Sequence, residues 1–134
     1  MAVVTATRYA RATGGRRDTD ITQYYAISAS GTAITTSSLG DTRPRKLVSV
    51  TIHYSAAAST AVLITVNYVG LTTAAGASAT TYDTTLTNPT LSAATDYVYQ
   101  PTGEFILSGL DTVTVTATPA ASNTAAIVIT TEVL

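Results

Sequence analysis

The stretch KLVSVTIHYSAAASTAVLITVNYV, residues 46–69, decides the fold. Its first half alternates two sets of side chains: Val48, Val50, Ile52 and Tyr54 against Ser49, Thr51 and His53. Because successive residues of a β-strand point to opposite faces, this half predicts a strand with one buried and one solvated face. The second half repeats the pattern with Val62, Ile64, Val66 and Tyr68. The short SAAAST between the halves predicts a hairpin that pairs the two strands.

The same period of two continues toward the C-terminus. TVTVTAT at 112–118 and AAIVITTEVL at 125–134 predict two more strands, with PAASN as a hairpin turn between them. Shorter strands are predicted at Ile21 to Ser28, Thr32 to Thr36, Thr80 to Leu86, Tyr97 to Tyr99 and Glu104 to Leu107. No stretch keeps a helical apolar stripe for three turns. The pattern therefore predicts an all-β fold: an antiparallel, jelly-roll-like β-sandwich of about eight strands, with a barrel as the alternative.

Length and composition favour one self-sufficient domain. A chain of 134 residues can bury roughly two-thirds of its unfolded surface, and we assign residues 21–134 to a single β-sandwich domain. The chain has no cysteine, so disulfides and thiolate metal sites are excluded. Neither a signal-peptide apolar region nor a run approaching about 18 apolar residues is present, so we expect synthesis without a signal peptide and no membrane span.

The first twenty residues differ from the rest. No alternation is visible there, and Gly14 and Gly15 would be costly inside a strand, so we predict that residues 1–20 form an extended basic N-terminal arm. The predicted partner-binding residues are Arg8, Tyr9, Arg11, Arg16 and Arg17.

Charge is distributed unevenly along the chain. Residues 1–46 hold seven basic and three acidic residues, whereas residues 47–134 hold five acidic and no basic residues. Clustered arginines repel one another unless an acidic surface receives them, so the arm is expected to dock on another protein or on a neighbouring copy. Asp18 and Asp20 partly neutralise Arg16 and Arg17, which argues against nucleic acid as the partner. A solvated tail that only aids solubility is the alternative.

The amino-acid sequence contains no recognisable catalytic, cofactor-binding or metal-binding motif. The single histidine, His53, falls on the polar side of a regular strand, and the acids show no spacing of a general acid and base. Asp18 and Asp20 resemble the start of a calcium loop, but the required glycine and distal glutamate are absent. The eight tyrosines are expected to pack in the core with the hydroxyl at the rim, and a face that stacks on sugar or binds protein is the alternative. We therefore predict a protein that is not an enzyme and needs no cofactor.

Four stretches of the chain share a pattern: residues 46–69, YDTTL, TDYVYQPTGEFILSGLDTVTVTAT and the terminal AAIVITTEVL. Within them an aromatic strand, a Pro-Gly-type turn, an apolar strand and a Gly-Asp turn lead into the last strands: Tyr97, Val98, Tyr99, Pro101, Gly103, Phe105, Leu107, Gly109 and Asp111. On these features, residues 45–134 resemble small β-rich structural proteins of tailed bacteriophages. The basic arm matches no motif of that family.

This resemblance implies a virion component. We expect a capsid decoration, or cement, protein on the capsid exterior, synthesised in the bacterial host cytoplasm. It would bind the major capsid protein across neighbouring subunits, as a homo-oligomer and most often a trimer, without nucleic acid or membrane partners. The alternative function is a phage fibre or receptor-binding module that recognises host-surface carbohydrate.

Overall fold

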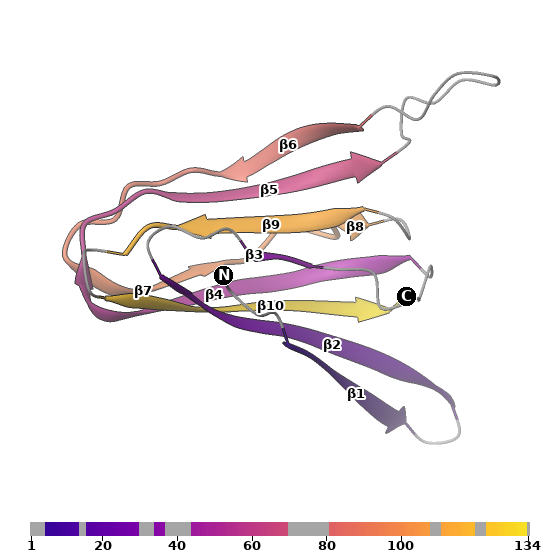
Figure 1. The fold of residues 1–134 in the computed structure, drawn as a ribbon. Helices are drawn as coiled ribbons and strands as arrows, with labels where there is room; N and C mark the ends of the chain where they lie inside the picture. The colour runs from indigo at the N-terminus through magenta and orange to yellow at the C-terminus, as the bar shows by residue number, and fades with distance from the viewer. Residues whose placement is uncertain are drawn as a thin grey trace.

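The computed structural model describes residues 5–13, 16–29, 34–36, 44–69, 81–107, 111–119 and 123–133. Every regular element in these ranges is a β-strand (Figure 1). The strands are β1 (Thr5–Thr13), β2 (Arg16–Ala29), β3 (Ile34–Thr35), β4 (Arg45–Ala58), β5 (Val62–Val69), β6 (Thr81–Thr87), β7 (Ala94–Tyr99), β8 (Ile106–Leu107), β9 (Thr112–Ala117) and β10 (Thr124–Val133). No helix in the described ranges could cross a lipid bilayer.

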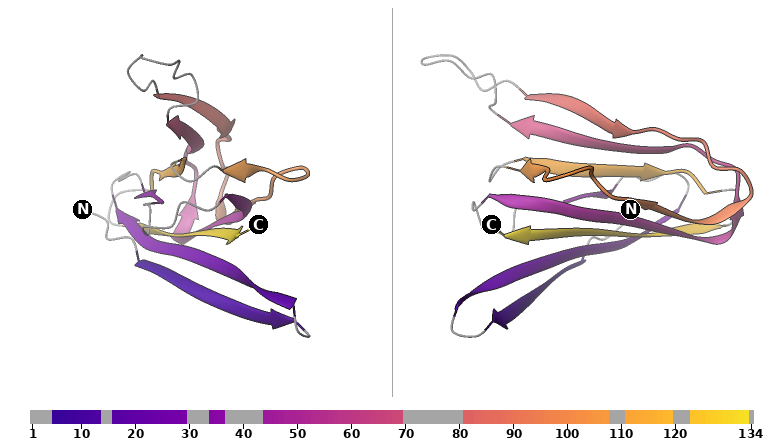
Figure 2. Two further views of the ribbon diagram at one scale, coloured as in Figure 1. Left: turned by 90° about the vertical axis from the view of Figure 1, so that its right-hand side faces the viewer. Right: turned by 180° about the vertical axis from the view of Figure 1, so that it is seen from behind.

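The strands form two antiparallel sheets that pack face to face. The larger sheet has the order β1-β2-β10-β4-β7, with β8 also paired to β4, and the smaller has the order β3-β9-β5-β6. Figure 2 shows the two layers from the side and from behind. The prediction of an all-β antiparallel sandwich is confirmed, and eight of the described strands are at least six residues long.

The core lies between the sheets and is built by the period-two alternation. In β10 every second residue is buried, and Ile127 and Ile129 have no exposed surface. Ile127 pairs with Ile52 of β4, and Ile64 of β5 pairs with Val115 of β9. Fully burying one such side chain contributes about 1.5–3 kcal/mol, so these four strands supply most of the hydrophobic stabilisation. A strand is present at each of the five shorter positions predicted from sequence, and the ends of β2, β7 and β8 are shifted by a few residues. The predicted starts at Thr32 and Thr80 lie outside the described residues.

The two predicted hairpins are wrong. Although β4 and β5 follow each other in the chain, β4 belongs to the larger sheet and β5 to the smaller. The same is true of β10 and β9. The strands exchange partners, so that β4 pairs with β10 and β5 with β9. Alternation shows which face of a strand is buried, but two strands can share a core across the sandwich as well as by hydrogen bonds within a sheet.

Val48 was expected on the buried face of β4 but is 36% exposed. The cause is a β-bulge: Thr130 pairs with Ser49 whereas the next residue, Thr131, pairs with Leu47. The extra residue reverses the alternation, so Arg45 and Leu47 are buried before the bulge and Val50 after it.

Strands β1 and β2 form an antiparallel hairpin at one edge of the larger sheet. The sequence predicted a strand from Ile21, but β2 already begins at Arg16, and residues 5–13 form β1 within the predicted arm. In the views of Figures 1 and 2 this hairpin diverges from the sandwich. The alternation was not visible because β1 is rich in threonine, alanine and arginine and has few apolar residues to mark a buried face.

Candidate interaction surface

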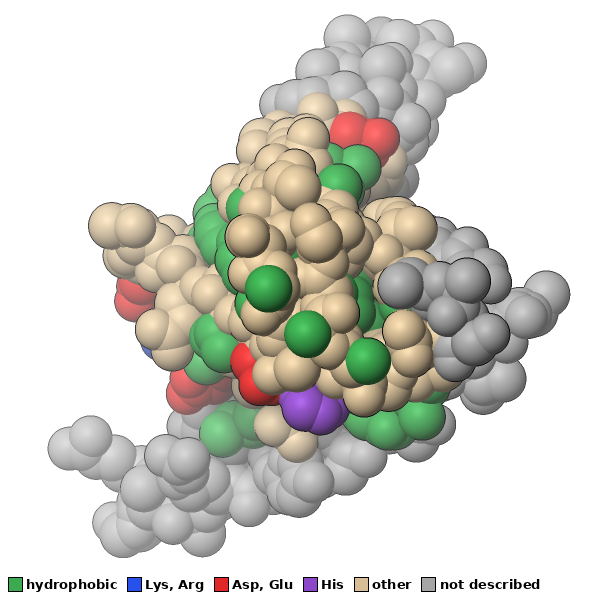
Figure 3. Space-filling model, turned by 90° about the vertical axis from the view of Figure 1, so that its left-hand side faces the viewer, with side chains coloured by type: hydrophobic (Ala, Val, Ile, Leu, Met, Phe, Trp, Pro, Cys, Tyr) green, Lys and Arg blue, Asp and Glu red, His purple; other side chains and the backbone are tan. Residues whose placement is uncertain are grey.

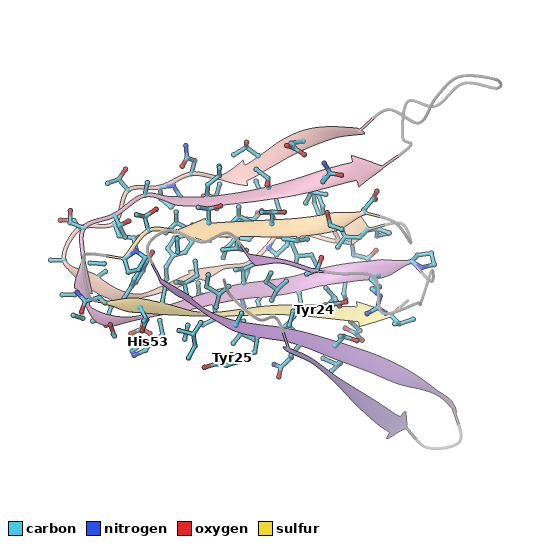
Figure 4. The ribbon with its side chains drawn as sticks, viewed as in Figure 1. Tyr24, Tyr25 and His53 are labelled. Carbon is cyan, nitrogen blue, oxygen red and sulfur yellow. The ribbon has the colours of Figure 1, made fainter. Side chains whose placement is uncertain are left out.

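The larger sheet turns one face away from the core. This outer face comprises Gln23, Tyr25, Ile27, Ser49, Thr51, His53, Asp96, Val98, Ala126, Val128 and Thr130. All of them are at least partly exposed, and they alternate with buried or core-packed residues along β2, β4, β7 and β10. Figure 4 shows Tyr25 and His53 on this side of the sheet, whereas the neighbouring Tyr24 lies in the core.

Apolar side chains cross the outer face in one row. Tyr25 pairs with Val128, Val128 with Thr51, and Thr51 with Val98, so the row spans β2, β10, β4 and β7. Tyr25 is 44% exposed and Val98 55%, and Ile27 in the adjoining row is 52% exposed. Directly opposed side chains on neighbouring strands lie about 5 Å apart. The row is therefore a continuous strip of apolar and methyl-bearing surface.

The smaller sheet presents a different surface. Its threonine face comprises Leu63, Thr65, Asn67, Asp83, Thr85, Thr112, Thr114 and Thr116. Among the described side chains, the large hydrophobic residues that are exposed all lie on strands of the larger sheet: Tyr25, Ile27, Val48, Val98 and Ile106. Threonine suits a solvated pleated surface because its branched side chain fits the strand while its hydroxyl stays hydrated. The two sheets thus present outer surfaces of different composition.

His53 and Asp96 form an exposed pair on the outer face. The imidazole Nδ1 lies 2.7 Å from the Asp96 carboxylate, and the pair joins β4 to β7 (Figure 3, which shows the histidine in purple). The hydrogen bond from His53, and then that from the Thr95 hydroxyl, lower the pKa of Asp96 below its usual value. Ser55 lies two residues along the strand, but its hydroxyl donates to the Asn123 side-chain oxygen and accepts a hydrogen bond from the Thr124 N–H. No described hydroxyl is therefore hydrogen-bonded to His53 as a nucleophile would be.

A second charge pair lies on the same sheet, toward the other end of β4. The Lys46 ammonium is 3.8 Å from the Glu132 carboxylate, and the two residues are directly opposed on β4 and β10. In both described charge pairs of this sheet, the two partners therefore belong to the same chain. The apolar row lies between these two pairs along β4.

The register places the predicted arm residues on different parts of the hairpin. Tyr9 pairs with Ile21, and Arg11 with Thr19, in the series that continues the outer face. Arg8 instead pairs with Thr22, whose side chain is buried. Arg16 pairs with Thr13 beside the turn, and Arg17 follows it in β2. The side chains of these residues lie outside the described part of the structure.

Sequence reasoning missed Tyr25, Ile27 and Val98 as surface residues. A signal was present in ITQYYAI, residues 21–27, because apolar residues occur on both faces of that strand. Of the tyrosines with described side chains, Tyr24 and Tyr54 are buried and Tyr97 and Tyr99 pack against the core, leaving Tyr25 exposed. Core packing is therefore confirmed for those four. No group of three potential metal ligands occurs among the described residues, and the side chains of Asp18 and Asp20 lie outside them.

A comparison with known protein families finds no family that matches the chain. A search of curated proteins also finds no match.

Proposed function

We propose that this chain is a non-enzymatic virion structural protein that decorates and stabilises a bacteriophage capsid. It binds the major capsid protein across neighbouring subunits and lies on the capsid exterior. One observation carries the proposal: exposed large apolar side chains occur on the larger sheet and not on the described threonine face. An apolar strip on one side and a hydroxyl-rich surface on the other suit a protein that covers a shell and faces water. The resemblance of residues 45–134 to phage structural proteins supports the same function.

The outer face is the surface through which attachment would act. The row from Tyr25 to Val98 buries apolar area against the shell. The charged side chains on either side of the row already pair within the chain, so they need no opposite charge from the partner. Each single contact of this kind is weak. Attachment becomes stronger when one copy bridges two capsid subunits, because the second contact adds binding energy without requiring a new type of interaction. Arg8, Tyr9, Arg11, Arg16 and Arg17 on the hairpin add contacts to acidic groups of the shell.

The experiment measures binding to two kinds of particle. Purified protein is incubated with phage capsids stripped of accessory proteins and with host cell envelopes, and bound protein is quantified after sedimentation. Saturable, stoichiometric binding to capsids is expected. Binding to envelopes that free sugar competes away would contradict the proposal and support a fibre or receptor-binding module instead.

Matched variants locate the contact. The outer-face variant Tyr25→Thr/Val98→Thr should weaken capsid binding at least about tenfold, because each truncated anchor at an interface centre typically costs more than about 1 kcal/mol. The control Thr65→Ser/Thr85→Ser makes the same number of changes on the threonine face and should bind normally. Equal loss in both variants, or in neither, would show that the outer face is not the attachment surface.

A further inference from the structure

Two strands at opposite limits of the molecule have an open edge. Within the described ranges β1 pairs only with β2, and β6 pairs only with β5. The ribbon views in Figures 1 and 2 all place β6 and β1 on opposite sides of the sandwich. An open edge carries a row of unpaired backbone N–H and C=O groups that can receive a strand from another chain. Because the two edges are far apart, they cannot pair with each other within one copy.

The remaining edges are poor templates. Strand β3 has only two residues. Strand β7 ends at Tyr99, and the edge resumes as β8 only at Ile106. Between them lie Pro101, which has no N–H, and Gly103, whose φ of 80° marks a turn. By contrast, β1 runs for nine residues and β6 for seven.

The two open edges carry opposite charge. Strand β1 contains Arg8 and Arg11 and no acidic residue, whereas β6 contains Asp83 and no basic residue. Asp83 is exposed, and the Asn67 amide, a neutral group, donates a hydrogen bond to it at 2.6 Å. Asp96 and Glu132 differ, because His53 and Lys46 already pair with them. Among the described residues no cation pairs with Asp83, so its charge is open to an arginine of another chain.

We propose that β1 of one copy adds to the β6 edge of the next copy, so that the protein assembles head to tail. Backbone hydrogen bonds extend the smaller sheet of the receiving copy by one strand. Because Arg8 and Arg11 lie on opposite faces of β1, one of the two comes to lie on the same face as Asp83. Pairing of β1 with β1 of a second copy is disfavoured because it brings like charges together. A head-to-tail contact uses two different surfaces and closes into a ring when its rotation permits. This assembly goes beyond capsid binding and does not depend on it.

The test measures the mass of the full chain by analytical ultracentrifugation at low ionic strength. The native protein should form a concentration-dependent oligomer. Asp83→Lys and Arg8→Glu/Arg11→Glu should each weaken self-association at least about tenfold, because each places like charges on the two edges. The combined variant Arg8→Glu/Arg11→Glu/Asp83→Lys reverses both edges together and should recover most of the association.

Glu104→Lys is the matched control, since Glu104 is an exposed acid outside β6. It makes the same charge change and should leave self-association intact. Circular dichroism and thermal unfolding of each variant show whether the sandwich itself has formed, so lost association is distinguished from lost folding. A native protein that is monomeric at all concentrations, a dissociating effect of Glu104→Lys equal to that of Asp83→Lys, or a failure of the folded combined variant to recover would overturn the proposal.

Discussion

Tyr54 places a phenol hydroxyl in the core without a hydrogen-bond partner in the described structure. Its side chain is 1% exposed and belongs to the cluster between the sheets. A buried polar group without a partner loses its hydration and gains nothing in exchange. Tyr97 provides a contrast, because its hydroxyl lies 3.2 Å from the Thr87 hydroxyl and can share a hydrogen bond with it.

The first prediction compares these two tyrosines. Tyr54→Phe should leave the free energy of unfolding unchanged or raise it by up to about 1 kcal/mol, because the substitution removes an unpartnered hydroxyl. Tyr97→Phe should lower it by about 0.5–1.5 kcal/mol, because a hydrogen bond is lost. Urea unfolding of both variants measures the difference. A larger loss for Tyr54→Phe than for Tyr97→Phe would show that the Tyr54 hydroxyl has a partner.

The same comparison has a pH dependence. Burial raises the pKa of Tyr54 above its ordinary value of 10.0. Above that pH an unfolded chain gives up the phenol proton while the folded chain retains it, so stability is lost as the pH rises through and beyond 10. The native protein should therefore lose stability more steeply in this range than Tyr54→Phe. Below pH 9 the two stability curves should run in parallel.

At the scale of strands, a buried arginine of β4 connects to the neighbouring strand β10 and to β2, the next strand beyond it. Arg45 is 8% exposed, and its Nη1 donates to the Thr22 hydroxyl of β2 at 3.0 Å and to the Thr131 hydroxyl of β10 at 3.5 Å. Thr22 and Thr131 are themselves buried and directly opposed. These contacts join β4 and β10 to β2, the strand through which the N-terminal hairpin is attached to the sheet.

The second prediction tests this cluster. Arg45→Met keeps the length of the side chain but removes its donors, and it should lower the free energy of unfolding by about 1–3 kcal/mol because the threonine hydroxyls lose a charged partner. The variant Arg45→Met/Thr22→Val/Thr131→Val removes both sides of the two arginine–threonine contacts and should recover part of that loss. It also removes the hydrogen bond that the Thr131 hydroxyl donates to the Thr22 carbonyl at 3.4 Å. Chemical unfolding monitored by circular dichroism measures both variants. A triple variant less stable than Arg45→Met would mean that this last bond outweighs the cost of leaving the two hydroxyls without the arginine.

Alternation along the chain predicted most strands and most of the core, but not the pairing of strands. Val62, Ile64 and Val66 are buried as expected. Every second residue of a strand is buried whenever one face of its sheet is covered, whichever strands are paired. Pairing depends on which strand lies beside which, and here the connections after β4 and β9 cross between the sheets. A single bulge likewise sufficed to expose Val48.

The outer face could not be predicted for the same reason. Tyr25, Val128 and Val98 are far apart in the sequence and meet only through the register of β2, β10, β4 and β7. The basic hairpin was visible as a charge cluster, because charge can be counted without knowledge of the fold. Strand β1 and the first residues of β2 were missed because the apolar residues that mark a buried face are few there.

For the whole molecule, attachment would combine two physically different contacts. The outer face offers apolar area, and its described charge pairs are closed within the chain. The hairpin offers arginines, whose attraction to an acidic surface is screened by salt over about 10 Å at 0.1 M ionic strength. Apolar burial is not weakened by added salt in this way. Salt should therefore separate the two contributions.

The third prediction uses the full chain and a chain that begins at Arg16, which lacks β1 but keeps all of β2. The described core cluster begins at Tyr24, so the shorter chain should still fold. Capsid binding by the full chain should weaken as sodium chloride rises from about 0.05 to 0.5 M, because the arginine contacts are screened. The shorter chain should bind more weakly at low salt and show a smaller salt dependence, since Arg8 and Arg11 are gone while the apolar row remains. Sedimentation of both chains with stripped capsids measures the two salt slopes, at protein concentrations at which ultracentrifugation shows each chain to be monomeric, so that self-association through β1 does not enter the comparison. Equal slopes would mean that the arginines of β1 make no contact with the shell. Equal affinities at low salt would mean that β1 adds nothing to attachment, which would then rest on the outer face and on the rest of β2, Arg16 and Arg17 included.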